Sequence, residues 1–199
     1  RNIEDAQTSV IELEMKTVKE LPALLGEADI FRTLQLKPGV ASAGEGNSGL
    51  YVRGGGPSQN LVLLDNATVY NPGHLLGFFS VFNADAIKSS TLIKGGIPAE
   101  YGGRISSVLD MTMREGNMKA YEFEGGIGAI SSRITAQGPI IKDKAAFIVS
   151  GRFTYLSFLL NPILERQENP VSIPWFFDVN AKMNFKMGEK DRLFISSYF

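Results

Sequence analysis

The stretch IKSSTLIKGGIPAEYGGRISSVLDMTM, residues 87–113, decides the fold of this chain. Two apolar alternating runs flank a glycine-rich turn, KGGIPAEYGGR. Alternation with a period of two is typical of strands, and glycine permits the backbone of a tight turn. The stretch therefore predicts a strand, a compact loop and a returning strand, in a small sheet domain folded on itself.

Composition excludes several classes of protein. The 199 residues carry a net charge of -1, which disfavours a nucleic-acid partner. The absence of cysteine excludes disulfide scaffolds, thiolate zinc sites and cysteine nucleophiles. The N-terminus is too polar for a signal peptide, and no window approaches the roughly 20 apolar residues of a membrane-spanning helix. If the chain crosses a membrane, it does so with strands.

The first part of the chain predicts a small mixed domain. Residues 1–20 are expected to form an extended lead-in, because their charges are mixed and their alternation is weak. A helix is expected over 26–36, where Ile30, Phe31 and Leu34 have the spacing of one helix face. Pro38-Gly39 would end this helix. Short strands are expected at LYVRG, NLVLLD and ATVY. NPGHLLGFF is expected to form a loop whose tip is apolar. FNADAI is expected to form one helical turn before the strand of residues 87–93.

Beyond Tyr121 the strands become longer. The clearest is WFFDVNAKMNFKM, in which apolar residues from Phe177 to Met187 alternate with polar ones from Asp178 to Lys186. Such alternation places the two sets on opposite faces of a strand. About five long strands follow this pattern, joined by short turns such as IIKDK and GEKD and by one long connection, LNPILERQENPVSIP.

The alternation fits two kinds of protein. It is expected for the strands of a membrane β-barrel and also for the half-buried strands of a soluble β-sandwich. Strands of about ten residues suit a tilted membrane strand, whereas soluble strands average about five or six. Short turns that alternate with long connections are also typical of outer-membrane barrels, and Tyr155, Trp175 and Tyr198 would suit an aromatic girdle. The pattern favours a membrane barrel. Because five strands would leave two open edges in lipid, we expect a fragment of a longer protein.

These residues resemble one family, the TonB-dependent outer-membrane receptors, in particular those of Bacteroidetes-type bacteria. The plug of that family reads PGV, then a loop, then RG, then a strand ending in aspartate, matched here by residues 38–40, 53–54 and 61–65. Its final stretch is matched by DAIKSSTLIKGGIPAEYGGRISSVLDM. The departures are Gly95-Gly96 in place of Gly-Pro, Asp65-Asn66 in place of Asp-Gly, and no clear TonB box in residues 1–20.

The resemblance implies a fold and a division of the chain. The fold class is mainly β, with a small α+β plug followed by the first antiparallel strands of a transmembrane β-barrel of about 22 strands. Residues 1–20 would be the lead-in, residues 21–116 the plug, and residues 117–199 the incomplete barrel.

The resemblance also implies a function. The receptor would lie in the outer membrane of a Gram-negative bacterium, bind a nutrient outside, and import it when the TonB–ExbB–ExbD complex rearranges the plug. The nutrient would be a siderophore, a glycan, a peptide or cobalamin, and a SusD-like lipoprotein is a further possible partner. No enzymatic activity, no metal and no cofactor are expected. The rivals are a structural, adhesive or signalling outer-membrane protein without transport, and a soluble β-rich binding domain.

Two basic residues are the candidates for a charge latch between plug and barrel. Arg53 is expected inside an apolar strand, and Lys94 at the end of another. In the family such residues pair with barrel glutamates, and a buried guanidinium needs a carboxylate partner. The alternative is that Arg53 pairs with a local acid such as Glu45 or Asp65.

Three loops match the plug apices that face the ligand in the family: ASAGEGNSG, GGPSQN and YNPGHLLGFF. The candidate ligand contacts are Glu45, Asn47, Ser58, Gln59, Tyr70, Asn71 and His74. Ordinary turn residues are an equal alternative for each of them. His74 is the only histidine, so it would act as a hydrogen-bonding group rather than in a histidine metal cluster. Leu75, Leu76, Phe78 and Phe79 could touch an apolar ligand, although packing against the barrel explains them better.

Two motifs carry no function. GIGAIS at residues 126–131 lacks the third glycine and the following helix of a dinucleotide fingerprint. RGGG at residues 53–56 occurs once in a neutral chain and is no RNA-binding repeat.

Overall fold

The computed structural model describes residues 9–20, 28–42, 49–74, 79–164 and 175–199. The chain forms two compact units, which are described separately: Arg1–Leu21 with Asp29–Met113, and Pro22–Ala28 with Arg114–Phe199. Within the described residues, no helix has the length and apolar character that a membrane crossing requires.

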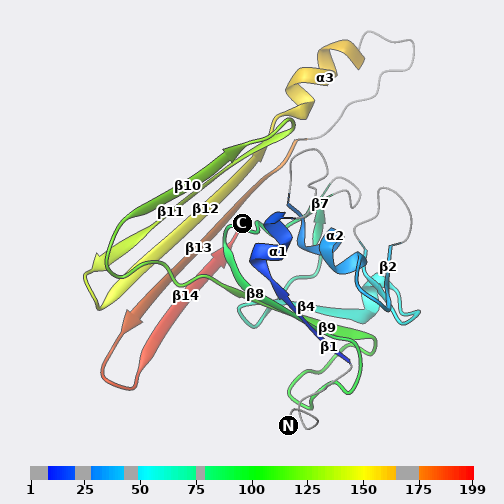
Figure 1. Cartoon of the computed structure of the whole chain (residues 1–199), viewed down its shortest axis with the longest axis horizontal. Helices are drawn as coiled ribbons and strands as arrows, with labels where there is room; N and C mark the ends of the chain where they lie inside the picture. The colour runs from blue at the N-terminus through cyan, green and yellow to red at the C-terminus, as the bar shows by residue number, and fades with distance from the viewer. Residues whose placement is uncertain (1–8, 21–27, 43–48, 75–78, 165–174) are drawn as a thin grey trace. The chain divides into compact units, whose positions relative to one another are not determined.

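A five-stranded sheet forms the centre of the first unit, in the order β1-β8-β9-β4-β5 (Figure 1). Its strands are β1 (Val10–Glu14), β4 (Asn60–Leu64), β5 (Ala67–Thr68), β8 (Ile87–Ile93) and β9 (Ser107–Met113). The β8–β9 pair is antiparallel and holds Ile93 opposite Val108. The strand, loop and returning strand predicted for residues 87–113 are therefore confirmed.

The core of this unit depends on a strand that is apolar on both faces. All five residues of β4 are buried, and β4 lies between the parallel strand β9 and the antiparallel strand β5. Leu61, Leu63, Ile93 and Val108 form one buried cluster on the sheet. Val10, Ile97 and Tyr101 pack against this cluster, so the glycine-rich loop folds back over the strands that it joins.

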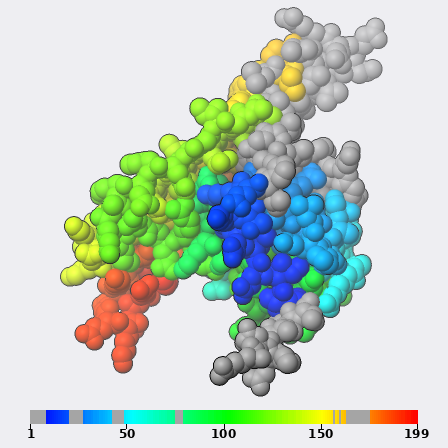
Figure 2. All heavy atoms as spheres, in the orientation of Figure 1, coloured from blue at the N-terminus to red at the C-terminus, as the bar shows by residue number. Residues whose placement is uncertain are grey.

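The N-terminal residues differ from the predicted lead-in. Val10–Glu14 is extended, but it pairs with β8 as an edge strand, with Val10 opposite Ile93. Met15–Glu20 forms the helix α1, so the extended conformation predicted for this segment is wrong. Val18 is fully buried and Lys19 forms a 2.6 Å ion pair with Asp85, a long-range contact that stabilises the helix against its local preference. Figure 2 shows the segment of β1 and α1 in dark blue.

The helix predicted over residues 26–36 is present but shorter. Helix α2 is Ile30–Gln35, and the buried Asp29 caps its N-terminus by accepting hydrogen bonds from Phe31 N at 2.7 Å and Arg32 N at 3.1 Å. The other carboxylate oxygen of Asp29 accepts a 2.6 Å hydrogen bond from Ser80 N. Two small hairpins complete the unit: β2 (Val40–Ala41) with β3 (Tyr51–Val52), and β6 (Gly73–His74) with β7 (Phe79–Ser80).

The second unit is a sheet of five antiparallel strands in chain order, which lie side by side in Figure 1. They are β10 (Glu122–Ile127), β11 (Ser131–Ile141), β12 (Ala145–Thr154), β13 (Phe177–Lys186) and β14 (Arg192–Tyr198). The predicted number of strands is confirmed, and three of the five have the predicted length of about ten residues. Along β13 the polar residues from Asp178 to Asn184 are buried and the apolar ones are half-buried or exposed, the reverse of a soluble sheet.

Two details of this unit differ from the predictions. The start of the long connection is a helix, α3 (Leu156–Leu164), rather than an irregular loop. Of the three aromatic residues predicted for a girdle, Trp175 is exposed. The hydroxyl groups of Tyr155 and Tyr198 instead bind within the sheet, to the Gly128 carbonyl and to Asp178 respectively.

Candidate functional site

One end of the first sheet collects most of the candidate residues. Strand β8 ends at Ile93, and β9 and the parallel β4 begin at Ser107 and Asn60. Because these three residues lie at the same end of the sheet, the loop before β4 and the loop between β8 and β9 must meet there.

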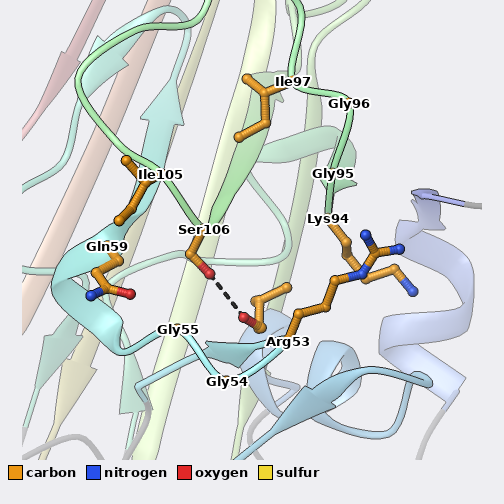
Figure 3. A pocket seen from close by; sticks show the side chains of 11 residues that line it. Arg53, Gly54, Gly55, Gln59, Lys94, Gly95, Gly96, Ile97, Ile105 and Ser106 are labelled. Atoms are coloured by element: carbon orange, nitrogen blue, oxygen red, sulfur yellow. Dashed lines mark hydrogen bonds between the residues drawn. The ribbon is translucent and has the colours of Figure 1, made fainter.

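The two loops enclose a hollow of about 590 Å³, which we name the basic hollow (Figure 3). Arg53 and Lys94 lie beside each other on one wall, and Gln59 and Ile105 lie on the opposite wall. The remaining lining includes the glycines of both loops. The structure thus brings together both predicted latch residues and one of the predicted ligand contacts.

Arg53 does not lie inside a strand, contrary to the sequence prediction. Strand β3 ends at Val52, and Arg53 has a left-handed backbone with φ of 49° in the turn that follows. Its backbone N–H donates a 3.1 Å hydrogen bond to Gly39 O, and its exposed guanidinium donates one of 3.5 Å to the Ser9 hydroxyl. Arg53 is therefore fixed at its backbone, while its charged end reaches into the hollow.

Lys94 directly follows β8, as predicted, and it is 8% exposed. Its ammonium group donates a 2.8 Å hydrogen bond to Pro38 O, and its backbone N–H donates one of 2.7 Å to Ser9 O. Among the residues that the structure describes, neither Arg53 nor Lys94 forms an ion pair with a carboxylate. The two cations consequently give this wall a positive charge that the described part of the chain does not balance.

The alternative partners proposed for Arg53 can be placed in part. Asp65 lies at the other end of β4 and accepts a 3.0 Å hydrogen bond from Met113 N, so it is not the partner of Arg53. Glu45 lies outside the described residues.

Two glycines allow the loops to approach each other. A Cβ at Gly55 would lie 2.2 Å from Ser106 Oγ, and that hydroxyl donates a 2.8 Å hydrogen bond to Val52 O. A Cβ at Gly95 would lie 2.5 Å from a guanidinium nitrogen of Arg53. A side chain at either position would occupy the space in which the two loops and the Arg53 side chain now meet.

The tyrosine of the glycine-rich loop is tied to the sheet. The Tyr101 hydroxyl donates a 2.9 Å hydrogen bond to Asp110 on β9. This hydrogen bond, together with burial and the negative charges of Asp110 and Glu100, raises the pKa of Tyr101 above its ordinary value of 10.0. The contact holds the loop that carries Lys94 and Gly95 onto the sheet.

The other predicted ligand contacts that the structure describes do not line the basic hollow. Ser58 and Tyr70 line a second cavity of about 40 Å³ together with Arg104. Asn71 is exposed, and His74 is half-buried in β6. Phe79 is buried in β7, so it does not face a ligand. Glu45, Asn47, Leu75, Leu76 and Phe78 lie outside the described residues.

Sequence analysis missed Ser9 and Ser106. Ser9 contacts the Arg53 guanidinium and the backbone N–H of Lys94, and Ser106 closes the floor of the hollow through Val52 O. Neither serine carries a local signal, because each acquires its place through a partner more than forty residues away. Gly55 could have been found, since a run of three glycines after Arg53 indicates a turn with close backbone approach.

The comparison with protein families decides the identity. The sequence model of the TonB-dependent Receptor Plug Domain matches residues 4–108, more than half of the chain. The chain belongs to the TonB-dependent receptors. The family resemblance predicted from the sequence motifs is confirmed, and with it the outer-membrane location. These proteins are receptors rather than enzymes, in agreement with the prediction of no enzymatic activity.

Solved structures of a siderophore receptor and of two metal transporters share the fold at low sequence identity. The siderophore receptor PirA from Acinetobacter baumannii is 20% identical, with a TM-score of 0.65 over 96% of this chain. The copper transporter OprC is 15% identical, with a TM-score of 0.64 over 97% of this chain. The FrpB iron transporter from Neisseria meningitidis is 16% identical, with a TM-score of 0.62 over 95% of this chain.

The chain spans about a third of each of these receptors: 31% of PirA, 30% of OprC and 31% of FrpB. The predicted fold class, a plug followed by the first antiparallel strands of such a receptor, is confirmed. A search of curated proteins finds no match to the chain.

Proposed function

We propose that the receptor containing this chain binds a nutrient outside the cell and imports it when TonB rearranges the plug. The observation that carries the proposal is the basic hollow, in which Arg53 and Lys94 lie on one wall without a carboxylate partner among the described residues. A transporter of this kind needs a plug that is held firmly and can still be released. Paired charges meet both needs, because an ion pair can be broken by a small displacement.

The two cations act as a latch whose carboxylate partners come from a part of the receptor beyond this chain. Lys94 is 8% exposed, and a cation with so little access to water is strongly favoured by an anionic neighbour. Arg53 supplies a planar guanidinium, the group best suited to hold a carboxylate through two hydrogen bonds. The glycines around the cations leave room for a carboxylate to approach.

The ligand contacts lie on the plug loops at the same end of the sheet. The described candidates are Ser58, Gln59, Tyr70, Asn71 and His74, all able to form hydrogen bonds, and Glu45 and Asn47 belong to the neighbouring apex loop. The ligand is a siderophore, a glycan, a peptide or cobalamin. The structural relatives are a siderophore receptor, a copper transporter and an iron transporter by name, and this favours a metal chelate for the present chain.

The proposal names two sets of partners. The TonB–ExbB–ExbD complex would supply the force on the plug, and a SusD-like lipoprotein would cover the receptor if the chain comes from a Bacteroidetes-type bacterium. The competing function is a structural, adhesive or signalling role in the outer membrane without transport.

Uptake measurements in cells test the transport function. Cells producing the full-length receptor would be offered a panel of radiolabelled ferric siderophores, cobalamin, oligosaccharides and peptides, with and without a functional tonB gene. We expect uptake of one ligand class that disappears without TonB. Binding without uptake in both strains would instead assign the chain to a signalling or adhesive receptor.

The latch is tested separately, by the leakiness of the plug. We expect Arg53→Ala and Lys94→Ala receptors to admit a large hydrophilic antibiotic such as vancomycin and to transport poorly. Arg104→Ala is the matched control for permeability, because it removes the same charge from the loop that carries Lys94 while lying outside the basic hollow. Unchanged permeability and transport in both latch variants would contradict the latch and leave the transport function standing.

A further inference from the structure

A further hollow lies on one face of the sheet β10–β14. We call this the outward face, because its apolar side chains are exposed. It measures about 400 Å³ and spans β11, β12 and β13, with Gly151 as its floor. The side chains on this face of the hollow belong to Ser132, Ile134, Phe153, Phe177 and Val179. We name it the Gly151 hollow.

Strand alternation separates this hollow from the charged groups of the same strands. Arg152 and Asp178 contribute to its lining, but their side chains point to the opposite face, where they pair and are 1% and 0% exposed. Ile134, Phe153 and Phe177 are 65%, 41% and 40% exposed on the outward face. The Gly151 hollow therefore opens on an apolar surface that the described chain leaves uncovered.

The register explains why the hollow exists. Gly151 lies between Ile134 on β11 and Val179 on β13, both of which carry branched apolar side chains. One position further along the outward face, Phe153 lies beside Phe177. Across β11, β12 and β13 this row of apolar side chains is thus interrupted at Gly151, which contributes none.

Neither the backbone nor the packing requires glycine at position 151. Its φ is not in the left-handed region, and an added Cβ would meet only Asp178 O, at the ordinary contact distance of 3.9 Å. The other strand glycines of this sheet are different. The ring of Tyr121 covers Gly138, with a carbon 2.2 Å from the Cβ position, and the Arg133 guanidinium lies 3.3 Å from that of Gly126. At Gly125, an added Cβ would lie 3.0 Å from Arg133 O. The space over Gly151 is left open where a side chain would fit.

Aromatic rings border the hollow on one side. The ring centroid of Trp175 lies 5.9 Å from that of Phe153 and 6.0 Å from that of Phe177. Phe158, at the start of α3, lies 6.1 Å from Phe153. These rings stand at the strand ends that lead into the long connection between β12 and β13. Long connections lie outside the cell in outer-membrane proteins, and aromatic residues gather where the membrane meets water.

We propose that the Gly151 hollow binds one acyl chain of a lipid of the outer leaflet. Apart from the Ser132 hydroxyl the hollow presents apolar side chains, and it continues the exposed apolar surface of a receptor that resides in the outer membrane. Its position beside the outer aromatic rings places it at the depth of the upper part of an acyl chain. A chain in this groove would contact Ile134, Phe153, Phe177 and Val179 at once.

Native mass spectrometry of the full-length receptor tests the proposal, with dimyristoyl phosphatidylethanolamine as the probe. We expect wild type to retain one lipid that resists removal by mild detergent. Gly151→Phe should weaken its binding by about tenfold or more, because the ring occupies the hollow. Val149→Phe is the matched control, because it adds a ring of similar size on the outward face of the same strand, outside the hollow.

Three outcomes would overturn the proposal. The first is that wild type retains no lipid, and the second is that Gly151→Phe retains it as tightly as wild type. The third is that both ring variants lose the lipid equally, as expected of general annular lipid.

Benzoylphenylalanine at position 177 gives an independent answer in living cells. A lipid adduct after illumination supports the proposal, and a protein adduct would assign the hollow to a partner chain instead. Thermal unfolding of each variant establishes that it is folded, and the open space at Gly151 makes folding the expected result.

Discussion

The backbone N–H of Lys94 donates a 2.7 Å hydrogen bond to the carbonyl oxygen of Ser9, which joins the end of β8 to the residue before β1. The hydroxyl of the same serine accepts a 3.5 Å hydrogen bond from the Arg53 guanidinium. One N-terminal residue therefore contacts the Arg53 guanidinium and the backbone of Lys94. A displacement of Ser9 would remove one hydrogen bond from each of these two residues.

The first prediction concerns the attachment of β1 to the plug. Leu13 is 3% exposed on this edge strand, so Leu13→Ala should lower the stability of the β1–β8 pairing by about 2–4 kcal/mol. Hydrogen exchange in the full-length receptor would report it as faster exchange of the β1 and β8 amides. Glu12→Ala, at an exposed position of the same strand, should leave the exchange unchanged. Equal exchange in both variants would mean that β1 contributes little to the plug.

The second prediction uses two adjacent glycines. A Cβ at Gly55 would lie 2.6 Å from Ser106 Cβ, whereas one at Gly56 would meet nothing within 4 Å. Gly55→Ala should therefore destabilise the plug by about 1–3 kcal/mol and break the Ser106–Val52 hydrogen bond. Gly56→Ala should be neutral, or stabilise by up to about 1 kcal/mol through the unfolded state. Limited proteolysis of the plug compares the two, and similar cleavage of both variants would contradict the packing described at Gly55.

Local patterns predicted the elements whose contacts are close in sequence. The strands of residues 87–93 and 107–113 follow from apolar alternation around a glycine loop, and the long strands of the second unit follow from the same period. Helix α1 was missed because its six residues have one buried side chain, Val18, and an ion pair with the distant Asp85. An isolated helix of that length is unstable, so only tertiary contacts explain it.

The candidate site, like the fold, was predictable only where local sequence carries the information. The charge of Arg53 and Lys94 is visible in the sequence, and both indeed line one hollow. The setting of Arg53 was not visible, because the apolar LYV before it suggests a strand while the structure turns at Arg53 with positive φ. Ser9 reaches the site through the pairing of β1 with β8, which no short pattern encodes.

The third prediction is a dependence on alkaline pH. The hydrogen bond to Asp110 raises the pKa of Tyr101 above 10.0, so the folded plug favours the protonated phenol. This contribution to stability is fully present below about pH 10, and it is lost as the pH rises through the raised pKa of the folded state. Tyr101→Phe removes the hydrogen bond, so its stability should be lower below pH 10 and should decline less steeply above it. Urea unfolding of the plug within the receptor between pH 8 and pH 12 measures both slopes. Parallel curves for the two proteins would show that the hydrogen bond does not contribute.

The fourth prediction concerns a buried ion pair of the second unit. The Arg152 guanidinium donates to Asp178 Oδ2 from Nε at 2.9 Å and from Nη2 at 2.5 Å, and it lies 5.3 Å from the Phe176 ring. Tyr198 donates a 3.0 Å hydrogen bond to the other oxygen of Asp178, so the group links β12, β13 and β14. Asp178→Ala would leave a buried guanidinium without this partner and should cost about 3–5 kcal/mol.

The double variant Arg152→Met with Asp178→Leu distinguishes a specific pair from general packing. Because it removes both charges and keeps apolar volume, it should recover most of the stability that Asp178→Ala loses. Tyr198→Phe removes one hydrogen bond and should cost about 1 kcal/mol. The temperature at which the full-length receptor loses its folded electrophoretic mobility ranks the variants. If the double variant is as unstable as Asp178→Ala, the pair does not act through its charges, and the shape of the two side chains determines the stability of these strands.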